Sequence, residues 1–131
     1  MITLSISTSK RNELIDITGK IKEKIREYGW NTGVLTVYCP HTTAGITINE
    51  NADPSVRTDI INTLAKLIPE YGDYAHTEGN SDAHLKSSLV GASAQVIVQA
   101  GQMMLGTWQG IYFCEFDGPR RRQVYLHFQP D

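Results

Sequence analysis

The feature that most constrains the fold is a series of three strand-like runs in the last third of the chain, over residues 95–100, 106–116 and 123–128. Each run is rich in β-branched and aromatic residues, and glycine, aspartate or proline lies between successive runs. In the longest run, alternate residues divide between two faces of a strand, so Glu115 shares its face with Ile111 and Phe113. This pattern predicts antiparallel strands in the C-terminal part of the fold.

The earlier two thirds of the chain mix strands and helices. Residues 2–7 alternate apolar and polar side chains, and residues 13–17, 34–39 and 45–49 are further candidate strands. Helical spacing predicts a helix that Thr18 caps and Gly29 ends, and a second one that begins at Asp53 and Pro54 and carries an apolar stripe up to Ile68. A short helix follows over residues 82–90, after a surface loop. We therefore expect one α+β domain over residues 1–131, a mixed or antiparallel sheet sandwich with helices packed on the sheet. A small barrel is the alternative.

Composition excludes several classes of function. A chain of 131 residues can bury one hydrophobic core without disulfides. A formal net charge of −2 argues against a protein that holds nucleic acid by neutralising phosphates. We find no pattern of a signal peptide and no apolar run near the roughly 20 residues that cross a bilayer, so we expect a cytoplasmic protein without a membrane partner. Cys39 and Cys114 lie in predicted strands and are expected to be buried free thiols.

Three of the four histidines, His41, His76 and His84, lie in one stretch that also contains several carboxylates and amides. Histidine is the commonest metal ligand and titrates near neutral pH, so such a cluster suits metal binding or acid–base chemistry. The spacing matches no short metal motif, and hydrogen-bonded surface histidines are the alternative. His127 lies in the last predicted strand and is expected to be structural or exposed.

Three carboxylates have different interpretations. Glu50 closes a predicted strand, from which its side chain could project into a cleft at the sheet end. Asp53 is explained by helix capping alone. Glu115 has apolar neighbours, and a buried carboxylate persists only beside a compensating cation or donor, which could be a metal or an arginine.

Two short segments could bind an anion. Lys86, with Ser87 and Ser88 behind it, offers a charge and hydroxyl groups, although helical lysines and serines are usually solvated. Arg120, Arg121 and Arg122 follow a predicted turn, and guanidinium pairs bidentately with phosphate, but a surface of salt bridges is equally consistent.

Three long blocks then identify a resemblance: HTTAGITINENADPSVRTD, HTEGNSDAHLKSSLVG and GTWQGIYFCEFDGPRRRQV. Together they resemble the YjbQ-like family, also known as the secondary thiamine-phosphate synthase enzyme family, over essentially the whole chain. The resemblance implies an α+β sandwich and a homotrimer with clefts between subunits. It also implies a set of site residues: His41, His76 and His84, which we expect to be metal ligands, together with Glu50, Asn51, Asp53 and Glu115. Of these we expect Glu50, Asn51 and Glu115 to be catalytic, and we expect Lys86, Ser87 and Arg120 to bind the substrate.

The activity implied by the family name joins a pyrimidine methyl diphosphate to a thiazole phosphate and releases diphosphate. Such a reaction needs a divalent cation, here zinc, magnesium or manganese, together with basic groups for the leaving diphosphate. We therefore expect a metal-dependent enzyme acting on a small phosphorylated substrate, with this synthesis as its main or side activity. The alternative is a non-catalytic trimer that binds a metal or an anionic metabolite, and an RNA-associated protein is a third hypothesis that the charge disfavours.

Overall fold

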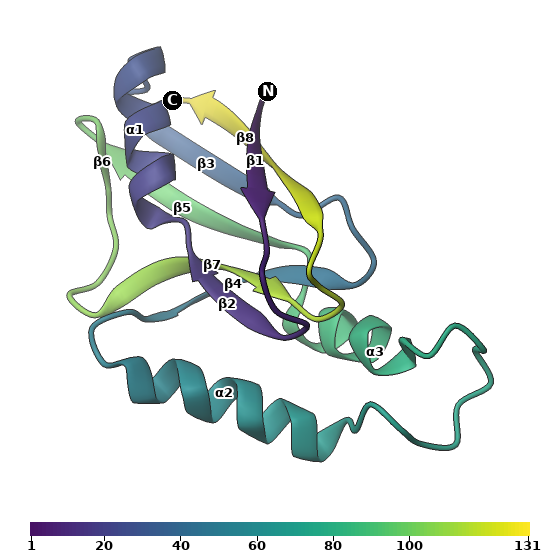
Figure 1. Cartoon of the computed structure of the whole chain (residues 1–131). Coiled ribbons are helices and arrows are strands. Elements are labelled where there is room, and N and C mark those ends of the chain that lie inside the picture. Colours follow the sequence, from purple (N-terminus) through teal and green to yellow (C-terminus); the bar gives the residue numbers. More distant parts are fainter.

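The chain folds into two antiparallel sheets and three helices (Figure 1). The computed structural model describes residues 1–131. The strands are β1 (Ile2–Ser7), β2 (Glu13–Asp16), β3 (Gly33–Tyr38), β4 (Ala44–Glu50), β5 (Ser93–Gln99), β6 (Gln102–Met103), β7 (Gln109–Glu115) and β8 (Arg121–Pro130), and the helices are α1 (Thr18–Tyr28), α2 (Pro54–Leu67) and α3 (Ser81–Val90). One sheet has the order β1-β8-β3-β5-β6 and the other β2-β7-β4. The predicted α+β class is confirmed.

The main hydrophobic core lies between the two sheets. Most of its 16 buried residues come from both sheets and from α1, and they include Leu35 of β3, Ile46 of β4 and Phe113 of β7. Ile21 and Ile25 bring the apolar face of α1 into the same core. Burial of these side chains from both sides explains why the sheets pack face to face as a sandwich.

A second, smaller core lies on the outer face of the three-stranded sheet. It contains Leu14, Ala83, Tyr112, Cys114 and Phe116. α2 and α3 cover this face, on the side away from the five-stranded sheet (Figure 1). The central strand β7 is therefore buried on both of its faces, which accounts for its apolar sequence.

The helix ends follow local sequence, with one exception. The Asp53 carboxylate accepts the backbone N–H of Ser55 at 2.9 Å, and Gly29 ends α1 in the left-handed conformation at φ 64°. The prediction that Thr18 caps α1 is wrong. Thr18 is already helical, and its hydroxyl accepts the backbone N–H of Ile111 at 2.8 Å, which ties the helix to β7. None of the three helices is both long and apolar enough to cross a membrane.

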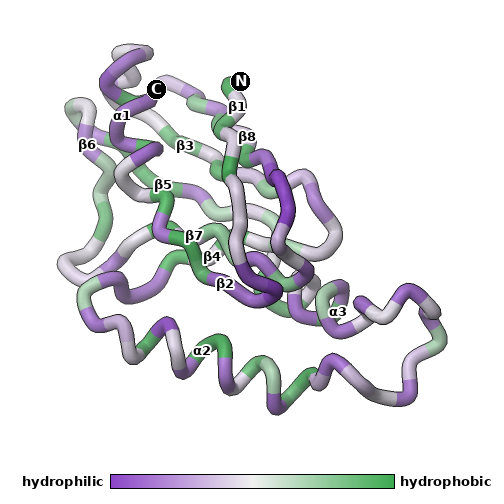
Figure 2. The backbone as a smooth tube through the Cα atoms, in the orientation of Figure 1, coloured by the Kyte–Doolittle hydropathy of each residue, from purple (hydrophilic) through white to green (hydrophobic).

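α2 and α3 differ in how deeply they are buried. No residue of the 14-residue α2 is fully buried, although hydrophobic and hydrophilic residues alternate along it (Figure 2). In α3, five of ten residues are buried, and two of these are the charged residues Asp82 and Lys86. α3 is thus more deeply buried than α2, although two of its buried residues are charged.

Candidate functional site

His41 lies in the connection between β3 and β4, and a hydrogen bond to its ring holds it in place. Its Nε2 accepts the backbone N–H of Gln123 in β8 at 2.9 Å. Burial, and then the positive charge of Arg122, lower the pKa of His41 below its ordinary value. The ring is therefore neutral at pH 7, and because Nε2 accepts a hydrogen bond, the proton lies on Nδ1.

His84 on α3 lies between the other two histidines. It lines a hollow of about 550 Å³ together with His41, Ser87 and Ser88, and a second hollow together with His76 and Leu85. The rings of His76 and His84 meet edge to face with centroids 5.4 Å apart. We call these two hollows, which share His84, the histidine groove. Three imidazoles from three segments of the chain therefore line one open surface.

The serines of the groove already use their hydroxyl protons. Ser87 Oγ lies 2.5 Å from the carbonyl oxygen of Thr42 and 3.0 Å from that of His84, and Ser88 Oγ donates to the His84 carbonyl at 2.8 Å. The bond from Ser87 to Thr42 attaches α3 to the β3–β4 connection, and the other two lie within the helix. Both hydroxyl oxygens keep free lone pairs, so in this arrangement they can accept hydrogen bonds from a ligand but not donate them.

Glu115 is completely buried and is bonded by four donors. Arg122 approaches it through Nε, 2.8 Å from Oε1, and through Nη2, while the Thr8 hydroxyl and the Asp117 backbone N–H add bonds of 2.8 and 3.0 Å. Burial raises the pKa of Glu115, but Arg122 and the other donors outweigh it, so the pKa lies below its usual value. Of the two partners expected for Glu115, the structure provides the arginine.

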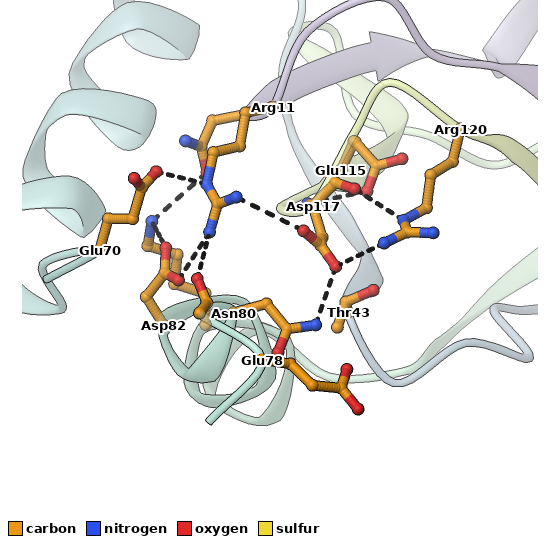
Figure 3. A network of polar contacts seen from close by, with 12 residues as sticks. Arg11, Thr43, Glu70, Glu78, Asn80, Asp82, Glu115, Asp117 and Arg120 are labelled. Carbon is orange, nitrogen blue, oxygen red and sulfur yellow. Dashed lines mark hydrogen bonds and ion pairs between the residues drawn. The ribbon is translucent and has the colours of Figure 1, made fainter. Parts of the chain in front are cut away.

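Lys86 also lies inside an ionic network instead of facing solvent. Its Nζ lies 3.1 Å from Asp82 Oδ2 and 3.3 Å from Asn12 Oδ1, and its side chain is 2% exposed. Asp82 in turn accepts a bond of 2.9 Å from Arg11, which also lies 2.6 Å from Glu70 (Figure 3). In this structure Lys86 stabilises α3 and has no exposed ammonium to offer to a substrate.

Arg120 is held at the rim of the same network (Figure 3). Its Nη2 lies 3.0 Å from Asp117 Oδ2, which also accepts the Asn80 amide at 3.0 Å. Burial raises the pKa of Asp117, but the bonds from Asn80 and Arg120 lower it by a larger amount. The pKa therefore lies below its ordinary value, and the carboxylate stays ionised. The Arg120 side chain is still 52% exposed and remains accessible to an anion.

Glu50 and Asn51 lie at the opposite end of β4 from the histidine groove. β4 runs over seven residues from Ala44 to Glu50, and six steps along a strand correspond to about 20 Å. The Asn51 amide lies 3.3 Å from Asp16 Oδ2, and Asp53 caps α2. The structure therefore does not bring Glu50 or Asn51 to the histidines within one chain.

The three histidines do not form a metal centre by themselves. No group of three or more His, Cys, Asp or Glu side chains is arranged to hold a metal ion. His41 Nε2 already accepts a backbone proton and its Nδ1 carries one, so neither nitrogen is free to coordinate in this state. Only the His76 and His84 pair offers imidazoles side by side. A metal bound here would need ligands from outside this chain.

Sequence reasoning did not find the ionic network around Arg11, Asp82 and Asp117. One signal was present, because Asp82 and Lys86 are four residues apart on a helix, the spacing of an ion pair. The partners Arg11 and Asp117 come from distant parts of the chain, so no local pattern identifies them.

The fold and the groove define a class of protein, an α+β sandwich with a histidine-lined groove beside the small sheet. The model of the family described as UPF0047 protein YjbQ-like matches residues 2–131. The chain belongs to this family. It is 60% identical over 121 residues to UPF0047 protein MJ1081 of Methanocaldococcus jannaschii, which covers 92% of this chain and 88% of the relative. It is 56% identical to UPF0047 protein YugU of Bacillus subtilis over 95% of both chains.

Solved structures have the same fold. An uncharacterised protein of the YjbQ/UPF0047 family from Clostridium acetobutylicum, 54% identical, superimposes with a TM-score of 0.96 over 98% of this chain and all of that one. A hypothetical protein from Aeropyrum pernix, 37% identical, gives a TM-score of 0.94 over 98% of this chain and 97% of that one. These likenesses establish the family and its fold.

Proposed function

We propose that the histidine groove binds a small phosphorylated molecule and that the chain is an enzyme acting on it. The observation that carries this proposal is that His41, His76 and His84, from separate segments, line two hollows that share His84. Imidazoles donate hydrogen bonds to phosphate oxygens and transfer protons near neutral pH. Arg120 does not line the two hollows, but its half-exposed guanidinium is a group that pairs with the same class of ligand.

The reaction we propose is the one implied by the family resemblance. The ring nitrogen of a thiazole phosphate attacks the methylene carbon of a pyrimidine methyl diphosphate, and the carbon–oxygen bond to diphosphate breaks, giving thiamine phosphate. The protein's task is to orient two anionic substrates and to stabilise the leaving diphosphate. Neutral His41 would donate through Nδ1–H, while His76 and His84 would donate to phosphate oxygens and exchange protons with them.

We propose further that the working form is a homotrimer in which a neighbouring copy completes the groove. Glu50 and Asn51 belong to the predicted site but lie about 20 Å along β4 from the groove of their own chain. The same end of the sheet carries Trp108, whose carbonyl accepts the Asn51 N–H and which is 61% exposed. Exposed tryptophans are enriched where protein chains meet. This corner therefore suits contact with the histidine groove of another copy.

A divalent metal is the second candidate for the groove. The adjacency of His76 and His84 favours it, since two imidazoles side by side can supply two ligands. The remaining ligands would come from a neighbouring copy or from substrate phosphate. Elemental analysis of protein purified without chelators tests this, with zinc, manganese and magnesium each added back. Less than about one tenth of an ion per chain would contradict metal binding. A metal that is retained by both His76→Ala and His84→Ala would show that these two histidines are not its ligands.

The proposed activity is tested by incubating the chain with the two thiamine precursors and magnesium and detecting thiamine phosphate by mass. His84→Ala should lower the rate at least about 100-fold, the usual contribution of an acid–base group. His127→Ala is the matched control, because His127 lies on the exposed face of β8. Equal rates in the two variants would contradict the groove as the site. Binding of the precursors without product would favour the non-catalytic alternative.

Mixing two inactive variants tests the completion of the groove between copies. His84→Ala and Glu50→Ala are unfolded together and refolded as mixed oligomers. If one groove uses His84 of one copy and Glu50 of another, some mixed oligomers contain an intact groove and activity returns in part. Activity that stays absent although mass measurement shows mixed trimers would contradict shared grooves, and a monomer in solution would contradict the trimer.

A further inference from the structure

A second cleft lies on the same side of the small sheet, between α2 and α3, and differs from the histidine groove in character. Its volume is about 440 Å³, which lies in the usual range for small-molecule sites. Leu14 of β2, Cys114 of β7 and Phe116 form its sheet side. Ile60 and Leu64 of α2 and Leu89 of α3 line the helix side. The cleft is therefore predominantly apolar.

The packing of α2 explains why this cleft exists. The helix carries an apolar stripe that should be covered, yet none of its residues is fully buried. Ile60 and Leu64 pack against the edge of the second core and remain partly accessible, and Leu89 is 65% exposed. Apolar surface on both walls of an open cleft stays in contact with water, and a ligand that displaces this water gains free energy.

The polar groups at the cleft set the chemistry of that ligand. Asp59 of α2 is the one charged residue among those that line it, and Asn49 and Thr47 of β4 supply amide and hydroxyl groups. The carboxylate favours a cation and repels an anion. The histidine groove differs, because imidazoles line it and no carboxylate residue is among its lining residues.

We infer that the cleft beneath α2 binds a small amphipathic molecule, with an apolar or aromatic body held between Leu64, Leu89 and Phe116 and a cationic or hydrogen-bonding end at Asp59. A drug-sized volume fits one such molecule. This site is separate from the proposed phosphate site and does not depend on it.

The test uses three probes of similar size and different charge: 2-phenylethylamine, 2-phenylethanol and 3-phenylpropanoate. Methyl NMR spectra of the full chain are recorded during titration with each probe. The amine and the alcohol should shift the methyl signals of Ile60, Leu64 and Leu89, and the amine should bind about threefold more tightly than the alcohol, as expected for one exposed ion pair. The propanoate should bind most weakly.

Two variants decide the outcome. Asp59→Asn should remove the preference for the amine while leaving binding of the alcohol unchanged. Leu89→Trp should fill the cleft from an exposed position, where the larger side chain costs little stability, and should weaken both probes at least tenfold. The inference is overturned if no probe shifts these methyl groups at millimolar concentration, or if Leu89→Trp binds as the parent chain does. Methyl signals that depend on protein concentration without probe would also overturn it, because a second copy would then occupy the cleft.

Discussion

The two helices that cover the small sheet are stabilised in opposite ways. α2 has the apolar stripe that usually faces a core, yet none of its residues is fully buried. α3 has charged and hydroxyl residues on its inner side, and half of it is buried. The difference arises from what the rest of the chain provides: Arg11 and Asn12 supply partners for Asp82 and Lys86, whereas nothing in the chain fills the space below α2. Burial of a helix thus depends on complementary groups elsewhere as much as on its own pattern.

The strongest way to break this comparison is to remove the buried charge of α3. Asp82→Ala leaves Lys86 buried with Asn12 as its remaining partner, so we expect a loss of about 3–5 kcal/mol in the free energy of unfolding. Asp59→Ala on α2 is the matched control, because its carboxylate is exposed, and should change stability by less than about 0.5 kcal/mol. Urea unfolding at fixed protein concentration measures both. Equal losses would show that the ionic network does not hold α3.

Acid should weaken the same network. The pKa values of Glu115 and Asp117 are lowered in the folded chain, so the unfolded chain binds more protons as pH falls. Their contribution is complete above the ordinary glutamate value of 4.5 and is lost progressively below it. Each unit by which a pKa is lowered corresponds to about 1.4 kcal/mol. Urea unfolding is measured from about pH 3 to about pH 6, a range that covers this loss. The free energy of unfolding should depend less steeply on pH for Glu115→Gln than for the parent chain, and an unchanged slope would contradict the assignment.

The apolar side of α2 should contribute less. Leu64→Ala should cost about 1 kcal/mol, below the roughly 2–5 kcal/mol of a fully buried leucine or isoleucine, since Leu64 lines an open cleft. Ile21→Ala in α1 provides the comparison, because Ile21 is completely buried in the main core. Similar losses in the two variants would mean that α2 is packed as tightly as α1.

The smallest effect is expected at the exposed end of the α2 stripe. Leu67 is 69% exposed, so Leu67→Ser should change stability by less than about 0.5 kcal/mol. Thermal unfolding would detect a larger loss as a clear drop in Tm. Such a drop would indicate that Leu67 is covered in solution, for example by another copy.

The sequence allowed the elements to be predicted because their signals are local. Alternation located β1, Asp53 and Pro54 located the start of α2, and Gly29 located the end of α1. Which charged residues are buried could not be obtained in this way. The pairing of Glu115 with Arg122 depends on two strands that meet through a turn, and the sequence left a metal and an arginine as alternatives.

The candidate site was predicted in part for the same reason. The sequence placed His41, His76 and His84 in one stretch, and the fold brings all three to one groove. The family resemblance also placed Glu50 beside them. The extended strand β4 carries Glu50 to its far end, so the fold of one chain does not bring Glu50 to the histidines.

The most direct test of the histidine groove is an NMR titration of the four imidazoles with diphosphate at constant pH. Our account predicts that the ring signals of His41, His76 and His84 shift together and saturate at one common concentration. His127, on the exposed face of β8, is an internal control and should not shift. Equal shifts in all four rings, or shifts in none, would contradict the assignment of the groove as the ligand site.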